Sequence, residues 1–247
     1  MAAAMARGWA DADGGPEVMA FADAGSGRAT ELAREVGGEA VGSVDELRER
    51  SDVIVLAVKR AALDEIARDM GGEVPPVISV LAGVSLARVK EALGGVPALR
   101  VMPNVAVEVR RGIVCYVRPA GDFPSELRER VLETLGVLGA MVAVDEGEID
   151  VATAVMSCSP AYIALVSETL ARAGEREGLP AELAHELVVD ALSGTAELLR
   201  SRDPAAIRRA VASPGGATEA GLEALERGGL GDAFEEAVQT SLKRMRG

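Results

Sequence analysis

Aromatic residues are scarce in this sequence. Phe, Trp and Tyr make up 2% of its 247 residues, although hydrophobic residues make up 49%. The interior must therefore be built from Ala, Val, Leu and Ile, which suits parallel strands and closely packed helices. Basic residues are also in the minority, with 26 Lys and Arg against 39 Asp and Glu, so the net charge is -13. Because this charge would repel phosphates, we expect no nucleic-acid partner.

Histidine and cysteine are nearly absent as well. The single His185 lies in a helical pattern between acidic residues and is expected on the surface, so we expect no metal site and no His-based triad. Cys115 and Cys158 form no disulfide framework, and Cys115 is expected to be a buried thiol in a strand. We expect no signal peptide, because no charged and then apolar pattern opens the sequence, and the apolar stretch 151–166 is too short for a membrane span. A cytoplasmic protein with no membrane partner is predicted.

Two kinds of pattern divide the chain near residue 145. Before it, β-branched runs alternate with helical segments, which is typical of a parallel sheet covered by helices. Ser43 and Ser85 are expected to cap two of these helices. After it, helical patterns continue and no strand pattern remains. The sequence predicts a Rossmann-type α/β domain over residues 1–145 and an all-helical domain over residues 146–247.

The individual elements follow from the same patterns. Strands are predicted over residues 18–22, 52–58, 77–81, 98–102, 113–117 and 141–144. Helices are predicted over residues 28–36, 44–50, 61–70, 85–93, 125–138, 148–174, 181–201, 204–212, 217–227 and 231–245.

The opening residues Met1–Trp9 form a good helix with no strand ahead of it. In a Rossmann unit, the central first strand and a Gly-x-Gly-x-x-Gly turn precede this helix. The segment Gly25–Gly27 only looks like that turn, because it follows the second strand. A sheet that lacks its first strand would split or expose two edges. We therefore expect that the sequence as given starts after the first strand and its Gly-rich loop.

Two separated motifs carry the most specific signal. Val101-Met102-Pro103-Asn104 ends a strand, and Ser213-Pro214-Gly215-Gly216-Ala217-Thr218 lies between two C-terminal helices. Together with Leu56-Ala57-Val58-Lys59, Pro160-Ala161-Tyr162 and Gly178-Leu179-Pro180, they resemble the pyrroline-5-carboxylate reductases in order and spacing over essentially the whole chain. The resemblance implies a nicotinamide-dependent imine reductase that makes L-proline in proline biosynthesis. It also implies a homodimer or a higher homo-oligomer.

The second motif is the predicted substrate site. Amides and hydroxyls at the start of a helix favour an anion, here the carboxylate of 1-pyrroline-5-carboxylate. The predicted substrate-binding residues are Ser213, Gly215, Gly216, Ala217 and Thr218. The resemblance gives Thr218 the catalytic role, a hydrogen bond to the ring nitrogen and donation of a proton. An ordinary loop with a helix cap is the alternative interpretation.

The cofactor implied by the resemblance is NADP(H) or NAD(H). Residues that end two buried strands are predicted to lie against it at the carboxyl edge of the sheet. These residues are Ala57, Val58, Lys59, Met102, Pro103 and Asn104, with Asn104 facing the nicotinamide or the substrate. Asp23 could accept a hydrogen bond from a ribose 2′-hydroxyl and favour NADH, whereas Ser26 and Arg28 could hold the 2′-phosphate of NADPH. The sequence leaves both preferences open.

Several residues depart from the family pattern. Arg60 replaces a proline, Val105-Ala106 replace Thr-Pro, and Ser157 and Ser159 replace two glycines, which puts the substrate in doubt more than the fold. A hydroxyacid or F420-linked reductase is one rival function, but it would need a catalytic lysine that residues 146–171 lack. A non-catalytic paralogue, or one of altered specificity, with a regulatory or binding role is the other.

Overall fold

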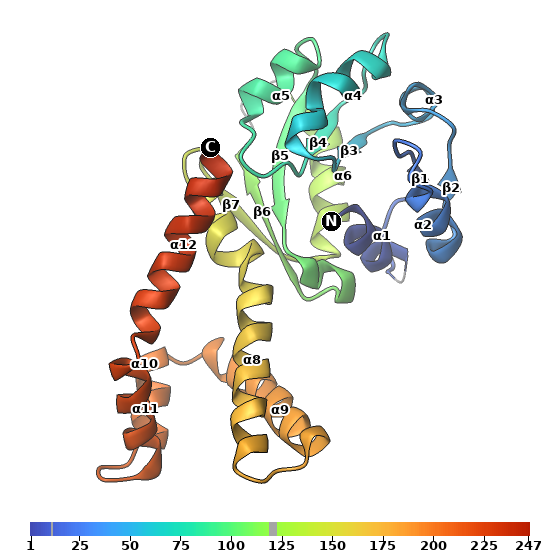
Figure 1. Ribbon diagram of the computed structural model, residues 1–247. Coiled ribbons are helices and arrows are strands. Elements are labelled where there is room, and N and C mark those ends of the chain that lie inside the picture. The colour runs from blue at the N-terminus through green and yellow to red at the C-terminus, as the bar shows by residue number, and fades with distance from the viewer. Residues whose placement is uncertain (11, 119–122) are drawn as a thin grey trace. The chain divides into compact units, whose positions relative to one another are not determined.

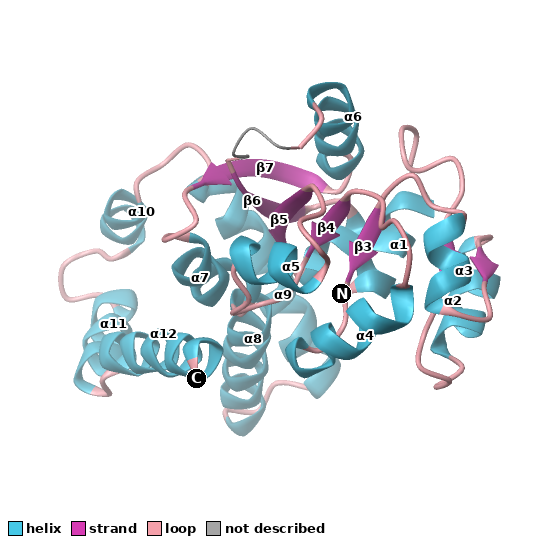
Figure 2. Ribbon diagram, turned by 90° about the horizontal axis from the view of Figure 1, so that it is seen from above, coloured by secondary structure: helices cyan, strands magenta, loops and turns pink. Residues whose placement is uncertain are grey.

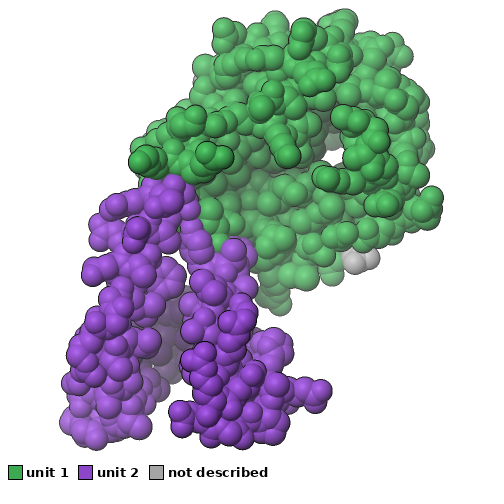
Figure 3. All heavy atoms as spheres, viewed as in Figure 1, with its two compact units in different colours: residues 1–158, 242–247 green, residues 159–241 purple. Residues whose placement is uncertain are grey.

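The computed structural model describes residues 1–10, 12–118 and 123–247. The chain forms two compact units (Figure 3): residues 1–158 together with 242–247, and residues 159–241. Mixed α/β structure gives way to helices near residue 145, and residues 146–158 pack with the first unit.

The first unit is built around a five-stranded sheet of order β3-β4-β5-β6-β7 (Figure 1). Its strands are β3 (Ile54–Leu56), β4 (Val77–Ser79), β5 (Ala98–Pro103), β6 (Gly112–Val117) and β7 (Gly139–Val144). The pairs β3-β4, β4-β5 and β6-β7 are parallel, as predicted, whereas β5 and β6 are antiparallel. The reason is the short connection between β5 and β6, which holds only the 3₁₀ turn Val105–Val109 and cannot make a parallel crossover.

Two further strands form a small sheet of their own. They are β1 (Ala20–Phe21) and β2 (Glu39–Ala40), which pair in parallel and are joined by α2 (Arg28–Val36). Among the residues that the structure describes, no strand hydrogen-bonds to both β1 and β3, so the two sheets are separate. This is the split that the sequence predicts for a sheet without a strand at that position.

Alternation along the strands creates two cores, one on each face of the five-stranded sheet. Leu99 and Val101 face the first core, whereas Ala98 faces the second. The first core is closed by α1 (Ala2–Ala10) and α6 (Ser125–Gly136), and the second by α4 (Leu63–Met70) and α5 (Leu86–Ala92). Figure 2 shows α6 on one side of the sheet and α4 and α5 on the other.

Serine caps begin two helices as predicted. The Ser43 hydroxyl accepts a hydrogen bond from the Glu46 amide at the start of α3 (Val44–Glu49), and Ser85 accepts one from Arg88 at the start of α5. The Glu46 carboxylate also accepts a hydrogen bond from the Gly42 amide at 2.9 Å, so the side chains of both Ser43 and Glu46 cap the start of α3.

The long apolar helix predicted over residues 148–174 is interrupted. It consists of α7 (Ile149–Ala152), a π-helical turn (Thr153–Ser157) and α8 (Ser159–Arg176). Pro160 has no amide hydrogen to donate to the carbonyl of Met156, and that carbonyl instead accepts the Asn104 side chain at 3.3 Å. A proline and a hydrogen bond from the sheet therefore fix the interruption together.

This helical run has a second property. The 28 residues Ile149–Arg176 are long and apolar enough to cross a membrane by length and composition, although the stretch 151–166 considered in the sequence is not. Length and composition alone are weak evidence, because a helix that packs against protein satisfies the same test.

The second unit contains only helices among its described residues. They are α8, α9 (Ala181–Leu199), α10 (Pro204–Val211), α11 (Ala217–Arg227) and the first part of α12 (Leu230–Arg246). Helices α8 and α9 pack through Ala171, Ala184 and Val188, and most other apolar side chains of the unit are exposed.

Candidate functional site

The carboxyl ends of β3, β4 and β5 lie at one edge of the sheet, because the three strands are parallel neighbours. Ala57 and Val58, half-buried, and the exposed Lys59 follow β3. Met102 and Pro103 end β5 and are buried. The structure thus brings both predicted cofactor segments to the edge where α/β proteins bind ligands.

Asn104, at the end of β5, uses its side chain on protein partners. Its Oδ1 accepts the Ile113 amide at 3.2 Å, and its Nδ2 donates to the Met156 carbonyl at 3.3 Å. The residue is 7% exposed. The side chain predicted to face the nicotinamide therefore ties β6 and the π-helical turn to β5.

Ser157, which replaces a family glycine, adds a second tie at the same place. Its hydroxyl donates to the carbonyl of Pro103 at 3.1 Å. The sequence predicts that serine here alters the approach of the backbone, but it does not predict this contact. The free carbonyl of Met156, implied by Pro160, is the signal that could have indicated a partner for the turn.

Asp23 follows β1 and organises the loop before α2. Its Oδ1 accepts the amides of Gly25 and Ser26 at 2.7 and 2.9 Å. Its Oδ2 accepts the Ser26 hydroxyl at 3.0 Å and the Ala29 amide at 2.7 Å. These bonds, the one from Ala29 first, hold the pKa of Asp23 below its usual range, although partial desolvation acts in the opposite direction. Arg28 is exposed beside this loop.

The corner Ser213–Thr218 lies in the second unit. Ser213 and Gly216 close a tight turn, in which the Gly216 amide donates to the Ser213 carbonyl at 2.9 Å. Gly215 has a φ of +72°, which glycine adopts without strain. A Cβ on Gly216 would lie 2.8 Å from Ser213 Oγ, so glycine is needed there too.

The same corner presents open amides. The first hydrogen bond of α11 runs from Ala220 to Gly216, so the amides of Ala217 and Thr218 precede the helical ladder. The side chains of Ser213 and Thr218 are exposed. The amide of Gly215 donates to the Glu219 carboxylate at 2.7 Å.

The buried Arg100 forms a charge cluster with two partly exposed carboxylates, and the sequence did not indicate this cluster. Its side chain, 3% exposed, donates to Glu146 at 2.9 Å and to Asp150 at 2.6 Å. Glu146 Oε1 also accepts the Leu86 amide at 3.0 Å. Because Arg100 lies in β5, the cluster anchors the chain beyond β7 to the middle of the sheet. A hollow of about 250 Å³, lined by residues around Ser85 and Glu146, lies next to it.

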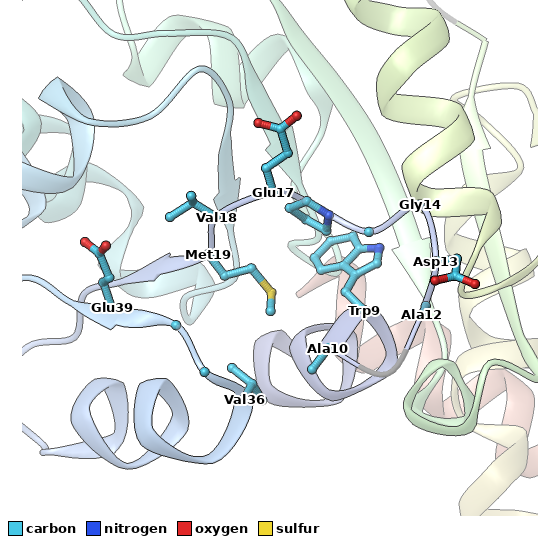
Figure 4. Close-up of a pocket in the computed structure, with 14 residues that line it drawn as sticks. Trp9, Ala10, Ala12, Asp13, Gly14, Glu17, Val18, Met19, Val36 and Glu39 are labelled. Carbon is cyan, nitrogen blue, oxygen red and sulfur yellow. The ribbon is translucent and has the colours of Figure 1, made fainter.

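A larger hollow of about 460 Å³ lies elsewhere in the first unit (Figure 4). Met19, which precedes β1, points toward the Trp9 ring, and the carboxylates of Asp13 and Glu39 lie on opposite sides of the hollow. None of the predicted site residues lines it. Within residues 1–10, 12–118 and 123–247, no three His, Cys, Asp or Glu side chains gather where they could hold a metal ion.

Family models match both parts of the chain. The model for pyrroline-5-carboxylate reductase dimerisation matches residues 146–247. The model described as NADP oxidoreductase, coenzyme F420-dependent, matches residues 1–83.

Named relatives agree with these matches. The chain is 37% identical to a pyrroline-5-carboxylate reductase of Synechocystis over 198 residues, 78% of this chain and 74% of that protein. It is 34% identical to the one of Corynebacterium melassecola over 205 residues, 79% of this chain and 76% of that protein.

Solved structures extend the similarity to the whole chain. The 1-pyrroline-5-carboxylate reductase of Streptococcus pyogenes, 29% identical, superposes with a TM-score of 0.91 over 100% of this chain and 94% of its own. The pyrroline carboxylate reductase of Plasmodium falciparum with NADP bound, 25% identical, superposes with a TM-score of 0.87 over 98% and 92%.

Proposed function

This chain belongs to the pyrroline-5-carboxylate reductase family, and we propose that it reduces the C=N bond of 1-pyrroline-5-carboxylate with NAD(P)H to give L-proline. The relatives described above carry the name of this activity, and one of them binds NADP. The observation in this chain that carries the proposal is the open start of α11, where amides and hydroxyls can receive a small carboxylate.

The substrate carboxylate binds at the Ser213–Thr218 corner in this proposal. The amides of Ala217 and Thr218 donate to it, and the positive end of α11 stabilises the charge. Ser213 supplies a hydroxyl donor, while Gly215 and Gly216 shape the turn and leave the carboxylate room to approach. Gly215 acts through shape because its amide is bonded to Glu219.

Thr218 is the proposed catalytic residue. Its exposed hydroxyl hydrogen-bonds the ring nitrogen and provides the proton that the nitrogen gains on reduction. The imine is a good electrophile once its nitrogen accepts this proton, which Thr218 regains from solvent, so positioning accounts for most of what the protein must supply. This explains how a chain with one exposed histidine can catalyse the reaction.

The cofactor lies along the carboxyl edge of the sheet in this proposal, and when bound it supplies the hydride. The residues fit its two ends: the exposed Arg28 suits the adenosine end, and half-buried Ala57 and Val58 suit the flat nicotinamide. Lys59 and the Met102–Pro103 segment border the same edge. Asn104 stabilises this edge through its side-chain hydrogen bonds to Met156 and Ile113.

The helical region 146–247 serves dimerisation and substrate binding. The match to a dimerisation family covers these residues, and apolar side chains on α8 and α9 are exposed. They include Ile163, Leu165, Leu170, Leu183 and Leu187. Burying this surface between copies gives a homo-oligomer and accounts for the apolar run Ile149–Arg176 without a membrane. A cytoplasmic location remains a prediction.

An activity assay tests the proposal. The full chain, mixed with 1-pyrroline-5-carboxylate and NADPH or NADH, should consume the nucleotide and form proline in equal amounts. Binding of nucleotide without turnover would favour the non-catalytic paralogue, and turnover with a different imine would favour altered specificity. Ser43→Ala, which changes a helix cap only, is the matched control and should retain the activity.

A further inference from the structure

Asp23 occupies the position where the sequence leaves the choice between NADH and NADPH open. In Rossmann domains, an acidic residue after the second strand accepts a hydrogen bond from the ribose 2′-hydroxyl, whereas a nearby arginine accommodates a 2′-phosphate. This loop contains both Asp23 and Arg28. The contacts of the two residues distinguish their roles.

The Asp23 carboxylate has no acceptor site left for a ribose. A carboxylate offers about four lone-pair sites. Here each oxygen already accepts two hydrogen bonds, from the amides of Gly25, Ser26 and Ala29 and from the Ser26 hydroxyl, all within 3.0 Å. A 2′-hydroxyl could bind Asp23 only if one of these bonds broke.

Ser26 and Arg28 differ in what they can still donate. The Ser26 hydroxyl gives its proton to Asp23, so its oxygen can only accept. Arg28 is exposed, and it makes no ion pair with any residue that the structure describes. Its guanidinium has five N–H groups in a fork that matches a phosphate.

We infer that Asp23 is a positioning residue, which fixes the loop 23–29 so that Arg28 receives the 2′-phosphate of NADPH, and that Asp23 does not select NADH. The inference deepens the proposed function and rests on it for the class of cofactor. The low pKa of Asp23 supports it, because the carboxylate stays ionised at neutral pH and keeps all four donors.

Binding of two small nucleotides tests the inference without any need for activity. The probes are 2′,5′-ADP, which carries the 2′-phosphate, and 5′-AMP, which has a free 2′-hydroxyl, each titrated into the full chain by calorimetry. Arg28→Ala should weaken 2′,5′-ADP about 10- to 100-fold, the range for a charge-assisted contact, and leave 5′-AMP nearly unchanged. Asp23→Ala should also weaken the binding of 2′,5′-ADP. The double variant should be little worse than Arg28→Ala, because Asp23 acts through Arg28.

Conservative variants separate positioning from simple loss of structure. Asp23→Asn keeps one acceptor oxygen, so its affinity for 2′,5′-ADP should lie between those of the natural protein and Asp23→Ala. Ser43→Ala, a cap in the same unit, should change neither affinity. The ratio of the KM values for NADPH and NADH should rise in Asp23→Ala and in Arg28→Ala.

The opposite pattern overturns the inference. If Asp23 instead bound the ribose 2′-hydroxyl, Asp23→Ala would weaken the binding of 5′-AMP and NADH, and 2′,5′-ADP would bind as before or better. Failure of the natural chain to bind 2′,5′-ADP also overturns it. If the binding pattern holds but no proline forms, the proposed function fails and the role of Asp23 stands.

Discussion

The Arg100 guanidinium in β5 donates to the Asp150 carboxylate in α7 at 2.6 Å. This contact joins the central strand of the sheet to the first helix beyond β7. The same guanidinium holds Glu146, so two acidic residues of the matched dimerisation region depend on one buried cation. The strand that carries the predicted cofactor segment Met102–Pro103 therefore also anchors the helical region.

Removing both acidic partners of Arg100 should cost more stability than removing Arg100 itself. The double variant Glu146→Ala with Asp150→Ala leaves a buried, unpaired cation, and we expect a loss of about 3–5 kcal/mol in the free energy of unfolding. Arg100→Met removes the charge and keeps the volume, so its cost should be clearly smaller. Urea unfolding measures both.

An exposed pair on the same segment is the control. Arg118 and Asp145 form an ion pair whose side chains are 59% and 70% exposed. Asp145→Ala should cost at most about 1 kcal/mol. If the double variant were no less stable than this control, the anchoring role of Arg100 would be wrong.

Asn104 should contribute directly to stability, and to catalysis only by holding neighbouring residues in position. Asn104→Ala leaves the Ile113 amide and the Met156 carbonyl without their partner, and we expect a loss of about 1–3 kcal/mol. If the side chain instead touched the nicotinamide, kcat would fall while the unfolding midpoint stayed unchanged. Ser157→Gly, which removes the bond to Pro103, should cost about 0.5–1.5 kcal/mol.

Thr218→Val should lower kcat by about 10²- to 10⁴-fold, the usual contribution of a general acid, because it removes the hydroxyl and keeps the shape. Thr218→Ser should recover most of the rate. Ser213→Ala should raise the KM for the imine and change kcat less, since its proposed role is to bind the carboxylate. Steady-state kinetics at saturating NADPH distinguishes these effects. Equal losses in Thr218→Val and Thr218→Ser would contradict the proton-donor role.

Substitution by alanine should have different effects at two glycines, one that precedes α11 and one within it. Gly216→Ala forces a Cβ to 2.8 Å from Ser213 Oγ and 2.9 Å from its carbonyl oxygen, so the turn must shift and the KM for the imine should rise about tenfold or more. Gly221→Ala, within the same helix, meets nothing within 4 Å and should stabilise the protein by up to about 1 kcal/mol. A rise in KM for both variants would show that the turn itself is not the cause.

Acid should release the loop at Asp23. Its pKa is lowered from the ordinary 3.8, so the folded loop is stabilised above that value and loses this contribution as pH falls through the lower folded pKa. When the affinity for 2′,5′-ADP is measured from pH 7 downward, protonation of Asp23 should therefore lower it only under strongly acid conditions. In Asp23→Asn this contribution to the pH dependence should be absent. A change near pH 6 that Asp23→Asn abolishes would contradict the assignment.

Most of the first unit could be predicted because its signals are local. The apolar runs around β3, β4 and β5 and the serine caps of α3 and α5 depend on neighbouring residues only, and the structure confirms them. The predicted burial of Cys115 is confirmed, and burial raises the pKa of its thiol. The exposed position of His185 is confirmed too.

The missed features depend on partners far away in the chain. Strand β2 consists of two exposed residues, Glu39–Ala40, and it exists only because β1 pairs with it. The charge cluster joins Arg100 to residues about fifty positions later, a pairing that no spacing rule indicates. Likewise, the motif around Asn104 correctly points to the edge of the sheet, but only the fold reveals that its amide is already bonded to Met156.

The helices of the second unit bury few side chains of their own, chiefly Ala171, Ala184 and Val188 among the residues that the structure describes. Three small residues remove little apolar area from water, so this unit on its own would be marginal. In the proposed homo-oligomer, its folding is coupled by mass action to association with another copy. The melting temperature should climb with protein concentration, and dilution alone should loosen the helices that carry the corner at Ser213.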